Sequence, residues 1–193
     1  MNPRQSLLPE ALRIPAPPYV NPFFWWAIGL GILCFLGRVE IKLIEDIPIT
    51  LQTLLVMVLP ALLGTRIGTL AVLGYLVAGG LGTPVFSGGK GGWEVFTGPT
   101  AGFLIGFLPA AWVTGKMVHS PWGQKILSVF LAMLAGHQIV LLFGLPWYGY
   151  QQGWEKIWPL WQSLTPGLLI KVALAGLITI LVRALLTRIS RTP

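Results

Sequence analysis

Charged residues are scarce in this chain of 193 residues: Asp, Glu, Lys and Arg make up 10% of it, whereas 54% of the residues are hydrophobic. A soluble domain typically has about a quarter of its residues charged. A chain this apolar cannot cover its surface with polar groups, so lipid must be the solvent for most of it. The composition therefore predicts an all-α integral membrane protein without a separate soluble domain.

Other absences remove further classes of protein. Cys34 is the single cysteine and lies in an apolar run, which excludes a disulfide framework or a cysteine-rich metal site. No paired carboxylates, Cys–His pair or Ser–His–Asp arrangement occurs at recognisable spacing, which argues against an enzyme, a resident cofactor or a metal centre. The basic residues sit in connectors and at the chain ends rather than on one face, so nucleic-acid binding is not indicated.

Six apolar runs are long enough to be membrane spans, each needing roughly 20 residues. They cover about 20–37, 47–64, 67–85, 96–117, 126–148 and 164–187, with Pro60 and Pro109 inside the second and fourth. We predict one six-helix membrane domain over 20–188, an N-terminal tail over 1–19 without an apolar signal core, and a C-terminal tail over 189–193.

The charges of the connectors predict the orientation. One set of segments carries eight basic residues and one acidic residue: Arg4, Arg13, Arg66, Lys116, Lys125, Arg183, Arg188 and Arg191 against Glu10. The other set carries four basic and five acidic residues: Arg38, Lys42, Lys90 and Lys156 against Glu40, Glu45, Asp46, Glu94 and Glu155. Cytoplasmic loops are enriched in Lys and Arg, so we expect both termini in the cytoplasm.

The predicted outer connectors are long and rich in glycine and aromatic residues. The third, Tyr148–Ser163, follows Trp147 and contains Tyr150, Trp154, Trp158 and Trp161. An interfacial aromatic belt is the simpler interpretation, and an aromatic lid over a ligand is the alternative.

Small residues recur at helical spacing within four of the runs, and such stripes let helices pack closely in lipid. They are Ala27 and Gly31; Gly74, Ala78 and Gly82; Gly102, Gly106, Ala110 and Thr114; and Gly167, Lys171, Ala175 and Thr179. The Ala27–Gly31 stripe, on the first helix, is also suited to docking a partner subunit.

Lys171 is the outlier among the spans. It lies ~10 Å into the last span, at 1.5 Å per residue, and a lysine there costs on the order of 3 kcal/mol. It shares the small-residue face, which should point into the bundle, and no acidic residue falls inside a span. We favour pairing with an anionic ligand over a lysine that reaches up to the lipid headgroups. For His137 and Gln138 we expect interhelical hydrogen bonds, and Gln52 could do the same or face a cavity.

The glycine-rich stretch from Phe86 to Phe103, FSGGKGGWEVFTGPTAGF, is not a nucleotide loop. It lacks Ser or Thr after Lys90, the four-residue spacing between glycines and a preceding strand. Its glycines instead favour a flexible outer segment that covers a ligand.

Several motifs together resemble a known family. They are IPITLQTLL, beginning at Ile47; GLGTPVF, ending at Phe86; GGKGGWEVFTGPTAGFLIGF, beginning at Gly88; GLPW at 144–147; and TPGLLIKVALA at 165–175. In combination they resemble BioY, the biotin-specific S component of energy-coupling factor (ECF) transporters.

The resemblance implies a six-transmembrane-helix bundle of ECF S-component type in a prokaryotic cell (inner) membrane. It implies biotin in an outward-facing pocket, with Lys171 binding the carboxylate. Partners would be the transmembrane coupling (T) subunit, docked on Ala27 and Gly31, and two cytoplasmic ATPases. The residues implied to line or cover the pocket are Gly88, Gly89, Lys90, Trp93, Thr100 and Phe103.

This sequence departs from the family at two ring-binding positions. Lys90 and Leu168 stand where some members have an asparagine and an aspartate that bind the ureido ring. Gln52 or the backbone amides of the glycine loop are then expected to hold the ring, unless the ligand differs. The alternatives to biotin capture are an S component for another small carboxylate vitamin and a structural or assembly membrane protein.

Overall fold

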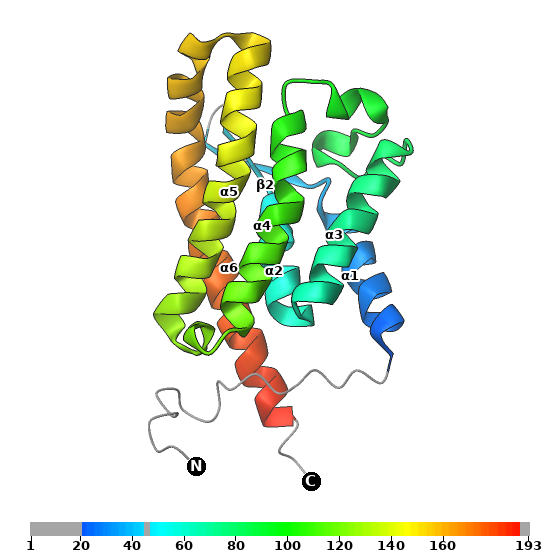
Figure 1. The fold of residues 1–193 in the computed structure, drawn as a ribbon, viewed down its shortest axis with the longest axis vertical. Coiled ribbons are helices and arrows are strands. Elements are labelled where there is room, and N and C mark those ends of the chain that lie inside the picture. The colour runs from blue at the N-terminus through cyan, green and yellow to red at the C-terminus, as the bar shows by residue number, and fades with distance from the viewer. Residues whose placement is uncertain (1–20, 45–46, 190–193) are drawn as a thin grey trace.

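The computed structural model describes residues 21–44 and 47–189 as six α-helices and one β-hairpin (Figure 1). The predicted six-helix fold is confirmed, and the β-hairpin makes the chain nearly all-α rather than all-α. The predicted tail over 1–19 and residues 190–193 lie outside the described residues. The elements are α1 Pro22–Leu36, β1 Glu40–Ile44, β2 Ile47–Thr50, α2 Leu51–Leu63, α3 Thr65–Gly80, α4 Ala101–His119, α5 Ile126–Gln152 and α6 Ile157–Ile189.

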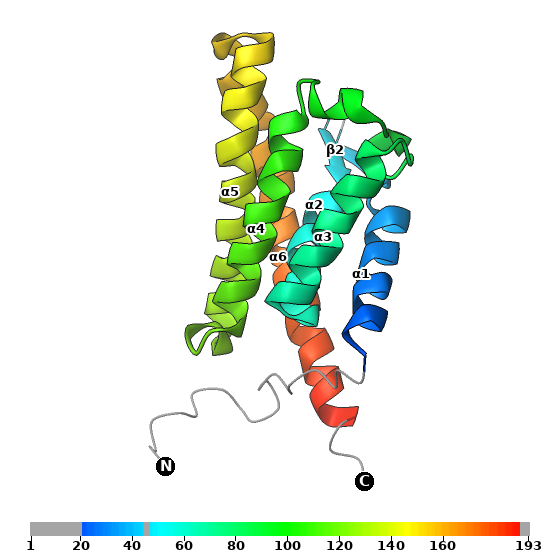
Figure 2. The ribbon, with the colours of Figure 1, turned by 45° about the vertical axis from the view of Figure 1, so that its right-hand side comes forward.

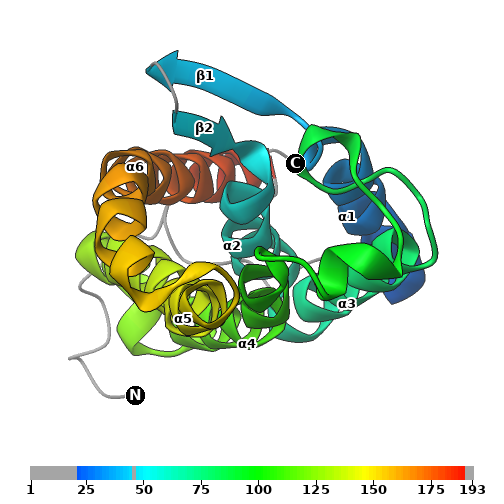
Figure 3. The ribbon, with the colours of Figure 1, turned by 90° about the horizontal axis from the view of Figure 1, so that it is seen from above.

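Helix α2 is the centre of the bundle. It contacts each of the other five helices, and the view along the bundle shows it lying among them (Figure 3). A helix that is apolar all round is buried, and α2 is buried continuously from Leu54 to Ala61. The side view shows α3 and α1 on one side of α2, and α4, α5 and α6 on the other (Figure 2).

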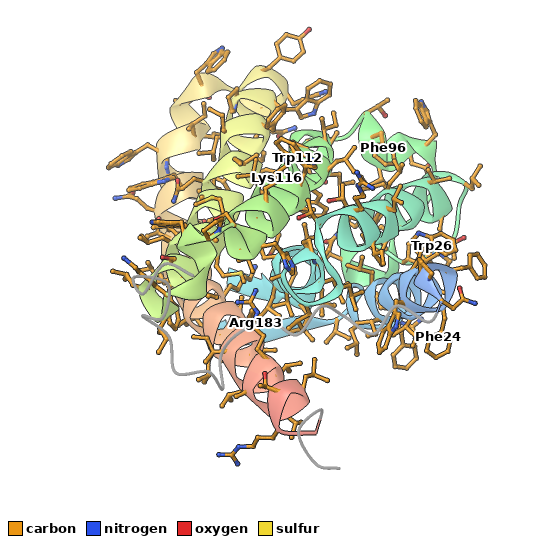
Figure 4. All side chains as sticks on the ribbon, turned by 60° about the horizontal axis from the view of Figure 1, so that its bottom comes forward. Phe24, Trp26, Phe96, Trp112, Lys116 and Arg183 are labelled. Atoms are coloured by element: carbon orange, nitrogen blue, oxygen red, sulfur yellow. The ribbon has the colours of Figure 1, made fainter. Side chains whose placement is uncertain are left out.

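The outside of the bundle is also apolar. Many large hydrophobic side chains face outward from α3, α4, α5 and α6, and Trp112 on α4 is 50% exposed. Beside it, the Lys116 ammonium lies 4.9 Å from the Trp112 ring centre (Figure 4). By length and composition, α4, α5 and the segment Trp154–Arg188 are able to cross a membrane, whereas α1 and α2 are shorter apolar helices.

Two predicted segments differ from the structure. The connector predicted over Tyr148–Ser163 is mostly helical: α5 continues to Gln152, and α6 begins at Ile157 after Gly153 and one 3-10 turn. Gly153 has φ 109°, a conformation that favours glycine, and this residue ends α5. The second span is shorter than predicted, because residues 47–50 pair with β1 in an antiparallel hairpin whose register joins Glu40 to Thr50.

Small residues account for the tightest helix contacts, as predicted for most of the stripes. Gly102 packs against Trp147, and a Cβ on Gly106 would lie 3.1 Å from the Cα of Val140. On α6, Ala175 and Thr179 are completely buried. The first stripe differs: Ala27 and Gly31 are exposed, and a Cβ on Gly31 would meet nothing within 4 Å. The stripe on α1 therefore packs against no other described part of the chain.

The C-terminal end of α2 is capped by two neighbouring helices. The last carbonyls of a helix have no partner within it. Arg183 on α6 donates from Nη2 to the carbonyl of Ala61, at 3.3 Å (Figure 4). His119, at the end of α4, donates from Nε2 to the carbonyl of Pro60, at 3.2 Å. A guanidinium near a helix C-terminus also interacts favourably with the helix dipole.

Candidate ligand-binding cavity

A cavity of about 300 Å³ lies between α2, α4, α5 and α6, at the end of the bundle that carries the hairpin. Half of the lining residues are apolar and come from α4, α5, α6 and the glycine loop: Phe86, Val95, Phe103, Leu104, Phe107, Val140, Leu141, Leu160, Leu164 and Leu168. The other half are polar or charged. An enclosure that combines apolar walls with placed polar groups is typical of a small-molecule site.

Lys171 supplies a positive charge on the α6 side of this cavity, and Lys90 of the glycine loop also lines it. The Lys171 ammonium donates to the Thr53 hydroxyl at 3.0 Å and to the Thr50 hydroxyl at 3.5 Å. Hydroxyl groups satisfy donors without neutralising the charge. Within the part of the chain that the structure describes, no carboxylate forms an ion pair with Lys171. A partly buried cation without a paired carboxylate creates a field that favours an anion in the cavity.

Two other polar side chains of the cavity wall keep an unsatisfied atom. Gln52, 5% exposed, lies beside the Tyr75 hydroxyl, and within the described ranges its Nε2 has no hydrogen-bond partner. His137, 4% exposed, bonds through Nδ1 to the Met133 carbonyl at 2.9 Å, and its Nε2 has none. The interhelical hydrogen bond predicted for His137 is wrong, because Met133 lies four residues earlier in the same helix. Gln138 is exposed on the other side of α5, and no interhelical hydrogen bond from it is present among the described residues.

The glycine loop and the hairpin segment meet at the mouth of the cavity. Gly88 has φ 70° and Gly89 has φ 71°, which lets the chain turn back so that the amide of Gly88 donates to the Arg38 carbonyl at 3.2 Å. The Ser87 hydroxyl donates to the Glu40 carboxylate. Two segments about 50 residues apart in sequence are thus joined over the cavity.

The structure brings together five of the predicted pocket residues. Gln52, Lys90, Thr100, Phe103 and Lys171 all line the cavity. Phe103 also packs against Gly144, where a Cβ would collide with its ring.

The other three lie beside the cavity. Gly88 and Gly89 shape the loop, and their amides donate to the carbonyls of Arg38 and Phe86. The Gly92 amide likewise donates to Gly79. Trp93 is 71% exposed and packs on Phe96, with 5.6 Å between ring centres. The amides of Gly88, Gly89 and Gly92 are therefore already hydrogen-bonded to backbone carbonyls.

The aromatic residues where α5 ends and α6 begins were predicted to form either an interfacial belt or a lid over a ligand, and they differ in their positions. Trp147 donates from its indole nitrogen to the Gly98 carbonyl at 2.9 Å, which ties α5 to the turn before α4. Tyr148 lines the cavity. Tyr150, Trp154 and Trp158 are more than half exposed, as in an interfacial belt.

Sequence reasoning missed several lining residues, among them Leu160 and Leu164. Together with Leu168 and the predicted Lys171 they are spaced by four, four and three residues, which is one face of a helix. This signal was in the sequence, but the predicted connector interrupted it. Glu40 and Ser87 carried no comparable local signal, since their contact depends on the tertiary fold.

The bundle and its cavity define a class of protein: a membrane-type helical protein with a cavity of small-molecule size beside a partly buried lysine. Comparison with known proteins then identifies the family. The chain belongs to the BioY family, whose profile matches residues 13–189.

Curated relatives and a crystal structure agree with this assignment. The biotin transporter BioY2 of Lactococcus lactis subsp. cremoris is 35% identical over 173 residues, which cover 86% of this chain and 90% of that protein. The biotin transporter BioY of Rhodobacter capsulatus is 37% identical over 172 residues, covering 78% and 88%. The crystal structure of the S component for biotin from an ECF-type ABC transporter superposes with a TM-score of 0.65 at 26% identity, covering 89% of this chain and 92% of that one.

Proposed function

We propose that this protein takes up biotin as the substrate-binding S component of an ECF-type ABC transporter. The observation that carries the proposal is the apolar cavity of about 300 Å³ with Lys171 in its wall and no ion-pairing carboxylate among the described residues. Biotin combines an apolar body with one carboxylate, which matches that arrangement. Family membership and the named relatives give the same substrate and make the chain a transport subunit rather than an enzyme.

In this proposal the carboxylate of biotin binds the Lys171 ammonium beside Thr50 and Thr53. Phe103 and Thr100 form the α4 wall, and Gln52 offers its free amide donor. Lys90 borders the mouth of the cavity.

The glycine loop acts as the cover. Gly88 and Gly89 give it the turn that places Phe86 and Lys90 on the cavity. Trp93 supports the loop from outside by packing on Phe96. Release of the contacts at Ser87 and Gly88 opens the mouth to the outside.

We further propose that the chain spans the inner (plasma) membrane of a prokaryote several times, with both tails, 1–19 and 189–193, in the cytoplasm and 20–188 as the membrane domain. The excess of Lys and Arg on one side supports this orientation. The start of α1 and the end of α6 lie at the same end of the bundle, opposite the hairpin (Figure 1).

The T subunit of the transporter is proposed to dock on α1, with transport energy from two cytoplasmic ATPases. Ala27 and Gly31 form an exposed small-residue stripe, and Phe24 and Phe35 beside it are 56% and 66% exposed. Small residues allow a partner helix to approach closely in lipid.

Equilibrium binding tests the proposed function. The purified protein in detergent is titrated with biotin while the fluorescence of its nine tryptophans is followed. The expected result is a saturable change at micromolar biotin or below. Saturation by another small carboxylate vitamin, with no response to biotin, would replace the substrate, and no response to either would overturn the proposal.

A further inference from the structure

The imidazole of His137 is part of the cavity wall. One of its ring nitrogens is hydrogen-bonded, and the other has no partner among the described residues. The side chain is 4% exposed and lines the cavity from the middle of α5. Its Nδ1 is 2.9 Å from the Met133 carbonyl oxygen. A carbonyl oxygen only accepts hydrogen bonds, so Nδ1 carries a proton. In the neutral ring, Nε2 is then an acceptor with no hydrogen-bond partner among the described residues.

A buried acceptor without a partner is costly. Leaving such a group unsatisfied destabilises a protein by about 1–3 kcal/mol, and buried polar groups nearly always find a protein or water partner. His137 lines the cavity, although Nε2 itself is enclosed by neighbouring atoms, so a small adjustment of the wall would let a bound molecule satisfy it.

The other polar groups of the cavity indicate which hydrogen-bond donors and acceptors the bound molecule needs. Lys171 has only donors, and the free atom of Gln52 is also a donor. On α6, one turn before Lys171, the wall carries the apolar Leu168. The carboxylate in the lining, Glu40, is at the mouth, is exposed, and accepts from Ser87. The hydroxyl groups of Thr100 and Tyr148 also line the cavity and can both donate and accept. His137, 4% exposed, supplies the buried ring acceptor, and its complement is an N–H donor on the ligand.

We propose that His137 is a specificity-determining residue whose Nε2 accepts a hydrogen bond from a ring N–H of the ligand. For biotin, on which this inference rests, the donor is an N–H of the cyclic urea. The ring then lies toward α5, and the carboxylate lies toward α2 and α6 at Lys171. The cavity selects a molecule that carries both a carboxylate and an N–H donor.

A ligand-and-variant cycle tests this pairing. Biotin and its two derivatives methylated at either ureido nitrogen are titrated into the wild type and into His137→Phe. In the wild type, one of the methyl derivatives should bind about ten- to a hundredfold more weakly than biotin, because its hydrogen bond is lost. His137→Phe should bind biotin more weakly than the wild type does, by a similar factor. In this variant, methylation at that nitrogen should lower the affinity by less than about threefold further.

Matched variants keep the test decisive. Gln138→Leu changes the exposed neighbour of His137 and should leave the affinities for biotin and for its methyl derivatives unchanged. Glu40→Gln tests the acceptor at the mouth and should preserve the discrimination between biotin and its methyl derivatives. His137→Leu repeats the experiment if His137→Phe does not purify as a folded protein. His137→Gln retains an acceptor and should keep part of the discrimination.

The outcomes separate this inference from the proposed function. Absence of biotin binding in the wild type would refute the function itself. Biotin binding with the same methyl discrimination in His137→Phe or His137→Leu as in the wild type would overturn the role of His137, leaving Nε2 hydrated. Loss of discrimination in Glu40→Gln alone would assign the ring to the mouth of the cavity.

Discussion

Replacing Lys171 by methionine tests how much the positive charge of Lys171 contributes to biotin binding. Met keeps an unbranched apolar stem of similar length, whereas the ammonium that donates to Thr53 at 3.0 Å and Thr50 at 3.5 Å is lost. If biotin binds through its carboxylate, the Lys171→Met variant should bind it much more weakly. The ligand-free variant should be as stable as the wild type or more stable, since a buried cation has been removed.

The expected size of the effect follows from the geometry of such a pair. Two unit charges about 4 Å apart attract by about 4 kcal/mol at an effective dielectric constant of 20. Removing the hydration of the carboxylate offsets part of this, and losing one partner of a buried charge pair costs about 2–5 kcal/mol. We expect a loss of about 2–4 kcal/mol, which is a rise in Kd of roughly 30- to 1,000-fold.

The assay is tryptophan fluorescence or calorimetry with biotin and with its neutral primary amide. The wild type should prefer biotin to the amide, and Lys171→Met should lose that preference. Thr53→Val is the matched control, because it removes one neutral contact of Lys171 and should raise Kd less than about tenfold. A Kd within about threefold of the wild type in a folded Lys171→Met protein would refute the reasoning and place the carboxylate elsewhere.

Three further substitutions test the bundle and its partner surface. Gly31→Leu should leave biotin binding by the isolated protein unchanged but abolish co-purification with the T subunit, because the exposed stripe on α1 would no longer accept a helix; unchanged co-purification would exclude that surface. Arg183→Met should lower the free energy of unfolding by about 1.5–3 kcal/mol, measured by thermal denaturation in detergent, because the Ala61 carbonyl loses its charged donor; the exposed Arg188→Met is the control, and equal melting temperatures would contradict the capping role. Gly144→Ala should push the Phe103 ring into the cavity and weaken biotin binding at least tenfold, and undiminished affinity would show that the ring has room to move.

Much of the fold was predictable because lipid imposes simple rules on a sequence. A long apolar run forms a helix, and Lys171 was conspicuous as a cation inside such a run. The spacing of Gly102, Gly106 and Ala110 predicted a close helix contact, and in the structure this face of α4 packs on α5.

The remaining features depend on contacts between distant parts of the chain. Near the end of α5, the Gln151 side-chain amide donates to the Thr97 carbonyl at 3.1 Å, which joins segments 54 residues apart in sequence. The hairpin is joined to the glycine loop through Glu40 and Ser87. Periodicity along one segment carries no information on such pairs, and the same holds for the free nitrogen of His137.

The most direct test of the central claim is a structure of the protein determined with biotin. We predict biotin in the cavity between α2, α4, α5 and α6, with its carboxylate within hydrogen-bonding distance of the Lys171 ammonium and the glycine loop closed over it. Biotin bound outside this cavity, or inside it with the carboxylate directed away from Lys171, would contradict the account.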